Sequence, residues 1–203
     1  LYEGGINRQL FLPFIAMMRE RMDVVRLDAR TDFRLEKLAG ATVYLTPTDA
    51  KAHAALDDLF TRLSGAKHGA PMALDVLGRA FPVPQAAGGV ARFTFDQLCG
   101  EARGAVDYLA LARRFHTVMI EHVPVMEHER INQALRFVTL VDTLYDARVK
   151  LILSAEAEPD FLCRANVPVF ERTASRLMEM RSEAYLGLHH EPPPSAVEEA
   201  ESC

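Results

Sequence analysis

An alternation of apolar runs between residues 115 and 153 limits the fold of this chain more than any other feature. Residues 115–121 are typical of a buried strand, residues 129–146 place apolar side chains at helical spacing, and residues 149–153 are typical of a second strand. Strands joined by such a helix lie parallel, and functional residues gather beyond their carboxyl ends. We therefore expect Glu121 and the segment 154–156 at that edge of a mostly parallel sheet. The inward face of the helix is predicted to carry Ile131, Leu135, Val138, Val141 and Tyr145.

The first half of the chain predicts a helix over residues 8–22 and a short strand over residues 24–27. Another strand is expected over residues 42–46. A helix follows over about residues 49–63, and its first residue, an aspartate, can cap it. Between residues 72 and 94, glycines and prolines separate two or three short strands.

The second half predicts helices on either side of the strand-helix-strand unit. Helical character begins at Phe95 and continues in a helix over residues 107–114. A final helix is expected over about residues 168–186. After it the sequence is rich in proline and glutamate, so residues 188–203 are predicted to be disordered. The inward side of the final helix should carry Phe170, Ala174, Leu177 and Met178.

Composition excludes some classes of protein. The chain has 203 residues, of which 49% are hydrophobic and 25% charged, as in one large globular domain. Its net charge of −5 gives no uniform basic field, which favours protein or small-molecule partners over nucleic acid. No apolar run reaches the roughly 18 residues that a membrane span needs. The widely spaced cysteines Cys99, Cys163 and Cys203 favour a reducing compartment.

Several motifs follow one another in a fixed order: Leu-Tyr-x-x-Gly-Ile-Asn-Arg at residues 1–8, Asp-Phe-Arg at 32–34, Phe-Asp-Gln-Leu-Cys at 95–99, Asp-Tyr-Leu-Ala at 107–110, Arg-Phe-Val-Thr-Leu-Val-Asp at 136–142 and Arg-Thr-Ala-Ser-Arg-Leu at 172–177. Together they resemble the ZapE family of AAA-type P-loop ATPases, which are bacterial enzymes with mitochondrial counterparts. The resemblance extends to about Leu186. One departure is Phe33, where the family usually has tyrosine.

The resemblance implies an α/β fold, namely part of an AAA-like P-loop NTPase sheet with a β-rich insertion and a helical C-terminal part. The implied divisions are the end of the ATPase core at 1–40, an α+β insertion at 41–94, a C-terminal α/β part at 95–187 and a disordered tail at 188–203. It also implies ATP and Mg²⁺ as cofactors. No Gly-x-x-x-x-Gly-Lys-Ser/Thr string occurs in the sequence, so ATP should be bound mainly by residues upstream, and this chain alone should not hydrolyse it.

Arg8 is the first candidate for catalysis. It begins a predicted helix at the place where, by resemblance, AAA-type enzymes put an arginine finger that reaches into a neighbouring subunit. A guanidinium suits this task because it stays charged and offers a planar fork to phosphate oxygens. An arginine on a helix surface can equally form an ordinary salt bridge.

Three further arginines resemble functional positions of the family. Arg172 and Arg176 lie four residues apart on one helical face, where they could serve as sensor or intersubunit arginines or belong to an ordinary solvated Arg/Glu stripe. Arg34 could be oriented by Asp32 or could simply pair with it.

The histidines and cysteines are weaker candidates for metal binding or catalysis. His116, His122 and His128 stand near glutamates, but their six-residue steps match no common metal-ligand spacing, so we predict no metal site. Cys99 lies in an apolar setting that favours packing over nucleophilic chemistry.

Two functions are compatible with the sequence. The first is part of an ATP-hydrolysing, homo-oligomeric enzyme that remodels a protein partner in bacterial cell division. Such a protein would act in the cytoplasm near the inner-membrane division site, and peripheral association with the membrane is left open. The alternative is a nucleotide-independent interaction or adaptor module. A phosphate-binding loop in the complete reading frame would decide between them.

Overall fold

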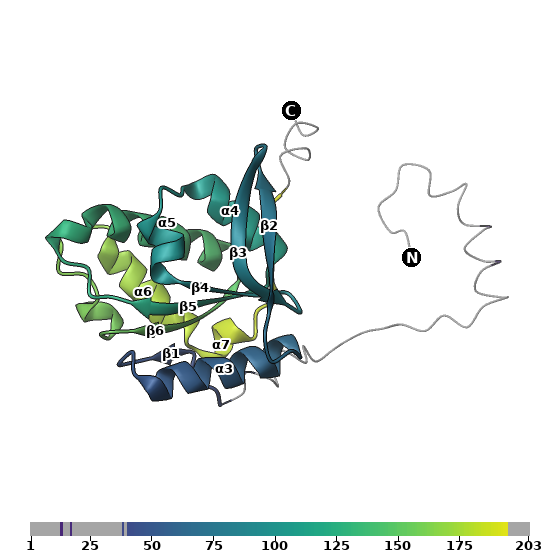
Figure 1. Cartoon of the computed structure of the whole chain (residues 1–203), viewed down its shortest axis with the longest axis horizontal. Coiled ribbons are helices and arrows are strands. Elements are labelled where there is room, and N and C mark those ends of the chain that lie inside the picture. The colour runs from purple at the N-terminus through teal and green to yellow at the C-terminus, as the bar shows by residue number, and fades with distance from the viewer. Residues whose placement is uncertain (1–12, 14–16, 18–37, 39, 195–203) are drawn as a thin grey trace. The chain divides into compact units, whose positions relative to one another are not determined.

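Four strands form the parallel part of a six-stranded sheet (Figure 1). This computed structural model describes residues 13, 17, 38 and 40–194. The order of the parallel strands across the sheet is β1 (Tyr44–Leu45), β6 (Lys150–Ala155), β5 (Thr117–Val123) and β4 (Val90–Thr94). Strand β6 lies where a second strand was predicted, and every one of its side chains is buried. The predicted strand-helix-strand unit and the mixed α/β fold are therefore confirmed.

The chain divides into two compact units, residues 1–31 and residues 32–203, and the sheet belongs to the second. In the first unit, Pro13 and Met17 are helical. The rest of the helix predicted over 8–22, and the strand predicted over 24–27, lie outside the described residues.

An antiparallel hairpin extends the sheet beyond β4. It consists of β2 (Ala70–Val76) and β3 (Arg79–Ala87), and β3 pairs with β4. Figure 1 shows the hairpin upright at the edge of the sheet. Gly89 lies in the turn before β4 with a φ of 77°, and a Cβ atom there would come within 2.6 Å of the His116 ring, so the turn requires glycine.

Helices cover both faces of the sheet. Helix α3 (Ala50–Ser64) begins at Asp49, whose carboxylate accepts the Ala52 N–H, and ends at Gly65 in the left-handed conformation. Its buried side chains share one apolar cluster with Met119 of β5. The residues on either side of Met119 in β5 point to the opposite face of the sheet, because side chains alternate along a strand. The larger core lies there, with α4 (Ala105–Arg114), α5 (Ile131–Asp146) and α6 (Phe170–Met180).

Short turns connect these elements. A π-helical turn over Asp96–Gly100 precedes α4, and 3₁₀ turns over His128–Arg130 and Pro159–Phe161 precede α5 and α6. The predicted final helix is divided in two, because α6 ends at Met180 and a separate helix α7 spans Glu183–Leu186.

Two predicted helix faces need correction. On α5, Ile131 and Leu135 are exposed, whereas Val138 and Val141 are buried as predicted. On α6, Met178 is exposed and Met180 is buried. Helix α5 packs against α4 and α6 as well as β6, so its buried arc is centred on the side chains that these three elements enclose. That arc is formed by Ala134, Phe137, Val138, Leu140, Val141 and Leu144.

The sheet crosses the boundary that the sequence placed between residues 94 and 95, because β1 pairs with β6 and β4 pairs with β5. Ranges 41–94 and 95–187 thus share one sheet. None of the helices in the described part of the chain is long and apolar enough to cross a membrane.

Residues 188–194 differ from the expected disordered tail. The buried ammonium of Lys150 donates to the carbonyls of Tyr185 and Leu188 at 3.0 and 2.7 Å. Further along, the Glu191 N–H donates to the Ala147 carbonyl at 3.0 Å, and Arg113 donates to the carbonyl oxygens of the prolines at 193 and 194. A buried ammonium needs acceptors, and backbone carbonyls supply them even where the side chains bury little.

Candidate functional site

The structure describes two of the four candidate arginines. Arg172 and Arg176 lie on α6, and both form ion pairs with aspartates of α5. Arg8 and Arg34 lie outside the described residues, so their proposed roles stay predictions.

Arg172 and Arg176 face Asp142 and Asp146, and we call these four residues the helix cluster. Arg176 lies 2.7 Å from a carboxylate oxygen of Asp142 and 3.3 Å from one of Asp146. Arg172 binds the other oxygen of Asp142. The side chain of Arg172 is 63% exposed and that of Arg176 is 19% exposed. The cluster therefore fastens α6 to α5 and leaves Arg172 accessible from solvent.

Tyr145 continues this arrangement. The Arg176 guanidinium stacks over its ring at 4.6 Å, and its hydroxyl donates to Glu179 at 2.8 Å. The hydrogen bond to Glu179 raises the pKa of Tyr145. The sequence analysis missed the aspartates as partners. A usable signal was present, because Asp142 and Asp146 repeat the four-residue spacing of the two arginines.

A second charged group lies between α3 and the carboxyl ends of β4 and β5. We call it the sheet cluster, and it consists of His53, Asp57, Arg92 and Glu121. Arg92 donates to Glu121 through Nε and to Asp57 through Nη1, the latter at 2.5 Å. His53 closes the ring, with Nδ1 2.9 Å from Glu121 and Nε2 3.7 Å from Asp57. Glu121 thus lies at the sheet edge where the sequence placed it.

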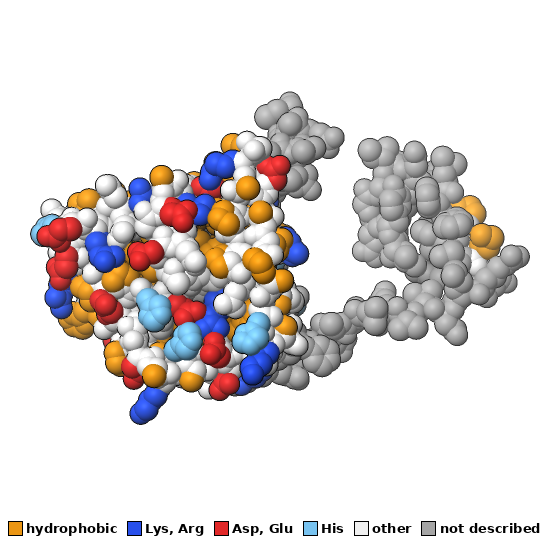
Figure 2. Space-filling model, viewed as in Figure 1, with side chains coloured by type: hydrophobic (Ala, Val, Ile, Leu, Met, Phe, Trp, Pro, Cys, Tyr) orange, Lys and Arg blue, Asp and Glu red, His pale blue; other side chains and the backbone are white. Residues whose placement is uncertain are grey.

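Two charged side chains of the sheet cluster are buried and therefore need partners. The side chains of Arg92 and Glu121 are only 6% and 11% exposed, so each charge depends on its partner in place of water. The hydrogen bond from Arg92 lowers the pKa of Asp57. Since each of the four members pairs with two others, one of them on the facing element, the geometry supports positioning of α3 on the sheet. Figure 2 shows histidine, acidic and basic side chains gathered on this face of the molecule.

Further polar side chains lie near the sheet cluster. The Ser154 hydroxyl accepts the His122 N–H at 3.1 Å, and His122 Nε2 lies 3.8 Å from Glu121. His116 is engaged elsewhere, with Nε2 3.0 Å from the Gly88 carbonyl oxygen. Across residues 40–194, no three histidine, cysteine or acidic side chains group in a way that could hold a metal ion.

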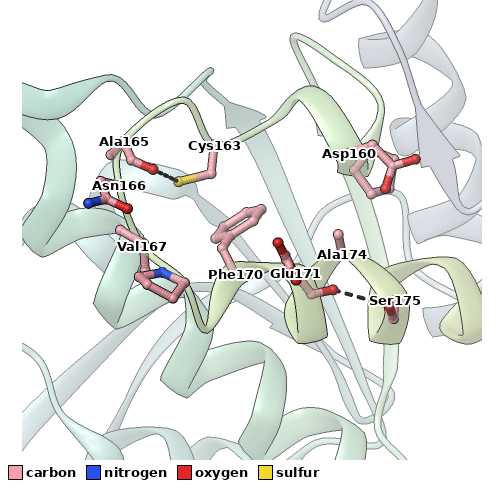
Figure 3. A pocket seen from close by; sticks show the side chains of 11 residues that line it. Asp160, Cys163, Ala165, Asn166, Val167, Phe170, Glu171, Ala174 and Ser175 are labelled. Carbon is pink, nitrogen blue, oxygen red and sulfur yellow. Dashed lines mark hydrogen bonds between the residues drawn. The ribbon is translucent and has the colours of Figure 1, made fainter.

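A pocket of about 470 Å³ lies between the turn at Pro159–Phe161, the following loop and α6 (Figure 3). In it the Cys163 thiol donates to the Ala165 carbonyl at 3.6 Å, and the Ser175 hydroxyl donates to the Glu171 carbonyl at 3.1 Å. Burial raises the pKa of Cys163, which keeps it a thiol at neutral pH. Cys99 is fully buried, and burial raises its pKa as well, so the packing interpretation is confirmed.

Strand β1, the turn after it and helix α3 form a strand-turn-helix. In P-loop proteins a unit of this kind carries the phosphate loop. Here the turn does not suit a phosphate. Asp49 already occupies one amide of the first turn of α3, since its carboxylate accepts the Ala52 N–H at 2.8 Å, and its charge would repel phosphate oxygens. This helix end therefore does not fit a nucleotide phosphate.

The parallel sheet and its crossover helices define a mixed α/β protein. The model of the AFG1-like ATPase family matches residues 1–189, and the chain belongs to this family. This membership confirms the resemblance recognised in the sequence.

Curated relatives include the cell division protein ZapE of Escherichia coli K12, which is 38% identical over 192 residues, or 94% of this chain. An uncharacterized protein of Schizosaccharomyces pombe is 40% identical over 77% of this chain and 35% of its own length. The lactation elevated protein 1 homolog B of Danio rerio is 31% identical over 91% of this chain and 44% of its own length. The chain spans about half, 51%, of the length of the E. coli relative. No solved structure matches the chain.

Proposed function

We propose that the complete protein hydrolyses ATP and uses the energy to remodel a protein partner in bacterial cell division. The observation that supports this function is the match of the AFG1-like ATPase model to residues 1–189, together with the similarity to a cell division protein. The protein would act as a homo-oligomer in the cytoplasm, near the division site.

ATP and Mg²⁺ are proposed to bind outside residues 40–194. The first turn of α3 is already capped by Asp49, and the described side chains include no cluster suited to a metal ion. When bound, the nucleotide supplies the phosphoryl group that is transferred to water. The described sheet would then serve as a rigid platform joined to that nucleotide site.

Among the arginines, we propose Arg8 as the residue that acts on ATP held by a neighbouring subunit. Arg176 is less suited to this role because two aspartates and the Tyr145 ring hold its guanidinium. Arg172 is the second candidate, since 63% of its side chain is exposed. Arg34 remains a further candidate for the same role.

The test compares Arg8→Ala with the unaltered protein, both expressed from the complete reading frame. A finger that acts in trans stabilises transition-state charge and contributes little to ground-state binding, so kcat should fall by about 10³-fold while ATP affinity is retained. Circular dichroism checks that the variant is folded.

Mixing experiments then test the geometry. A variant with the phosphate-binding lysine replaced, but with intact Arg8, should restore part of the turnover when mixed with Arg8→Ala, because each supplies what the other lacks. Normal hydrolysis by Arg8→Ala would transfer the role to Arg172. Absence of ATP hydrolysis by the unaltered protein would contradict the proposed function itself.

A further inference from the structure

The turn between β2 and β3 exposes a large apolar side chain in an unfavourable backbone conformation. Leu77 is 87% exposed, the highest value among the exposed large hydrophobic residues of the described chain. Its φ is 53° and that of Gly78 is 75°, the left-handed region that suits asparagine or glycine in a two-residue hairpin turn. Asp75 holds the turn by accepting the Gly78 N–H at 2.8 Å. Neither solvation nor turn geometry favours leucine at this place.

A pocket of about 630 Å³ opens beside this turn, between the hairpin and the start of α4. Its apolar lining includes Leu77 and Val106, and Val106 is also exposed. The hairpin turn and the first residues of α4 therefore present one continuous concave surface. The charged residues of the lining are Arg79, Arg103, Arg136 and Asp107.

The three guanidinium groups of the pocket are held in place by the protein. Arg79 donates to the buried carboxylate of Asp107 at 2.6 Å, and Arg136 donates to the Cys99 carbonyl at 3.0 Å. Arg103 stacks over the Phe81 ring at 4.4 Å and pairs with Glu101 at 2.5 Å. Fixed guanidinium groups lose little side-chain entropy when they bind a carboxylate.

The charge of the pocket is opposite to that of the whole chain. Three arginines line it, and Arg79 pairs with Asp107 while Arg103 pairs with Glu101. The charge of Arg136 leaves this surface net positive, whereas the chain carries a net charge of −5. The side chain of Arg79 is 54% exposed, so its outer N–H groups can reach a bound molecule. A ligand that complements this surface carries carboxylates and at least one apolar side chain.

We propose that the β2–β3 turn and this pocket form the docking surface for an acidic segment of a protein partner. An apolar side chain of that segment packs against Leu77 and Val106, and its carboxylates pair with Arg79 and Arg136. The identity of this partner as the remodelled protein rests on the proposed function, but the docking surface does not. Apolar anchors inside a polar rim are the usual anatomy of such interfaces.

The probe is a short synthetic peptide rich in glutamate and aspartate with one central phenylalanine, labelled for fluorescence anisotropy. We expect saturable binding that weakens as salt is added. Leu77→Asn should weaken binding by about tenfold while the fold is kept, because asparagine tolerates the left-handed turn. Phe161→Asn is the matched control, since Phe161 is 67% exposed but lies outside the pocket, and it should bind like the unaltered protein.

Four outcomes would overturn the proposal: no binding of the acidic peptide, equal binding by Leu77→Asn, equal binding of a basic peptide of the same length, or displacement of the acidic peptide by a single-stranded oligonucleotide. If the unaltered protein self-associates but binds no peptide, and Leu77→Asn no longer self-associates, the surface would instead be assigned to a second copy of the chain. ATP turnover of the complete protein is measured in parallel. Peptide binding without turnover would leave the docking surface standing and contradict only the proposed enzyme.

Discussion

The sheet cluster and the helix cluster combine the same chemical groups in different surroundings. In the sheet cluster, Arg92 and Glu121 are 6% and 11% exposed, and the pair lies under α3. In the helix cluster, Arg172 is 63% exposed and solvent reaches its guanidinium directly. Water screens Arg172 directly and cannot screen the Arg92–Glu121 pair, while Arg176 and Asp142, each 19% exposed, lie between these extremes. We therefore expect burial, more than the number of ion pairs, to decide how strongly each cluster holds its helix.

Removal of a charge from the sheet cluster should have the largest effect. Glu121→Gln leaves Arg92 without its main counter-charge in a buried site, and we expect a loss of about 3–5 kcal/mol in the free energy of unfolding. Urea denaturation followed by circular dichroism measures it. Glu129→Gln is the control, because Glu129 is exposed and should change stability by less than about 0.5 kcal/mol. Equal effects of the two substitutions would contradict the idea that the buried Arg92–Glu121 pair stabilises the fold more than an exposed charge does.

The helix cluster should give a smaller effect. Arg176→Ala removes two ion pairs and the contact with the Tyr145 ring, and we expect a loss of about 1 kcal/mol. Arg172→Ala should stay within about 0.5 kcal/mol because its side chain is mostly solvated. A double-mutant cycle between Arg176 and Asp142 isolates the pair. A coupling energy as large as that between Arg92 and Glu121 would show that the helix cluster is shielded more than its exposure indicates.

The smallest expected effect is the dependence of stability on pH. The hydrogen bond from Arg92 lowers the pKa of Asp57 in the folded chain below its unfolded value. Its contribution is therefore complete above the ordinary carboxyl pKa of about 4 and is lost as the pH falls through the lowered pKa. Over this pH range the melting temperature of Asp57→Asn should fall less steeply with decreasing pH than that of the unaltered protein. The difference should be larger at low salt. Parallel pH profiles for the two proteins would contradict the assignment.

Much of the fold could be predicted because apolar runs and helix caps are local signals. The run at 115–121 and the cap at Asp49 both predicted elements that the structure contains. Glu121 was placed at the correct edge because it ends a strand. Two helix faces were wrong, because the periodicity of α5 does not reveal that α4 and α6 enclose it along with the sheet.

The sites were harder to predict because their members come from distant parts of the chain. His53 and Glu121 are 68 positions apart in the sequence, and only the packing of α3 on the sheet brings them together. Arg172 and Arg176 were recognised by resemblance, but their partners on α5 follow from the pairing of two helices. Leu77 offered no signal at all, since an isolated leucine beside a glycine is ordinary until its exposure and backbone angles are known.

The bonds that hold residues 188–194 have a mechanical consequence. The ammonium of Lys150, the first residue of β6, binds the carbonyl of Tyr185 in the last turn of α7 and that of Leu188 just after it, and Arg113 holds the chain again at residues 193 and 194. Tension applied beyond residue 194 therefore reaches Arg113 on α4 and Lys150 on β6 before it can unwind α7. We expect the load to be shared among these hydrogen bonds, so that this end of the domain resists force.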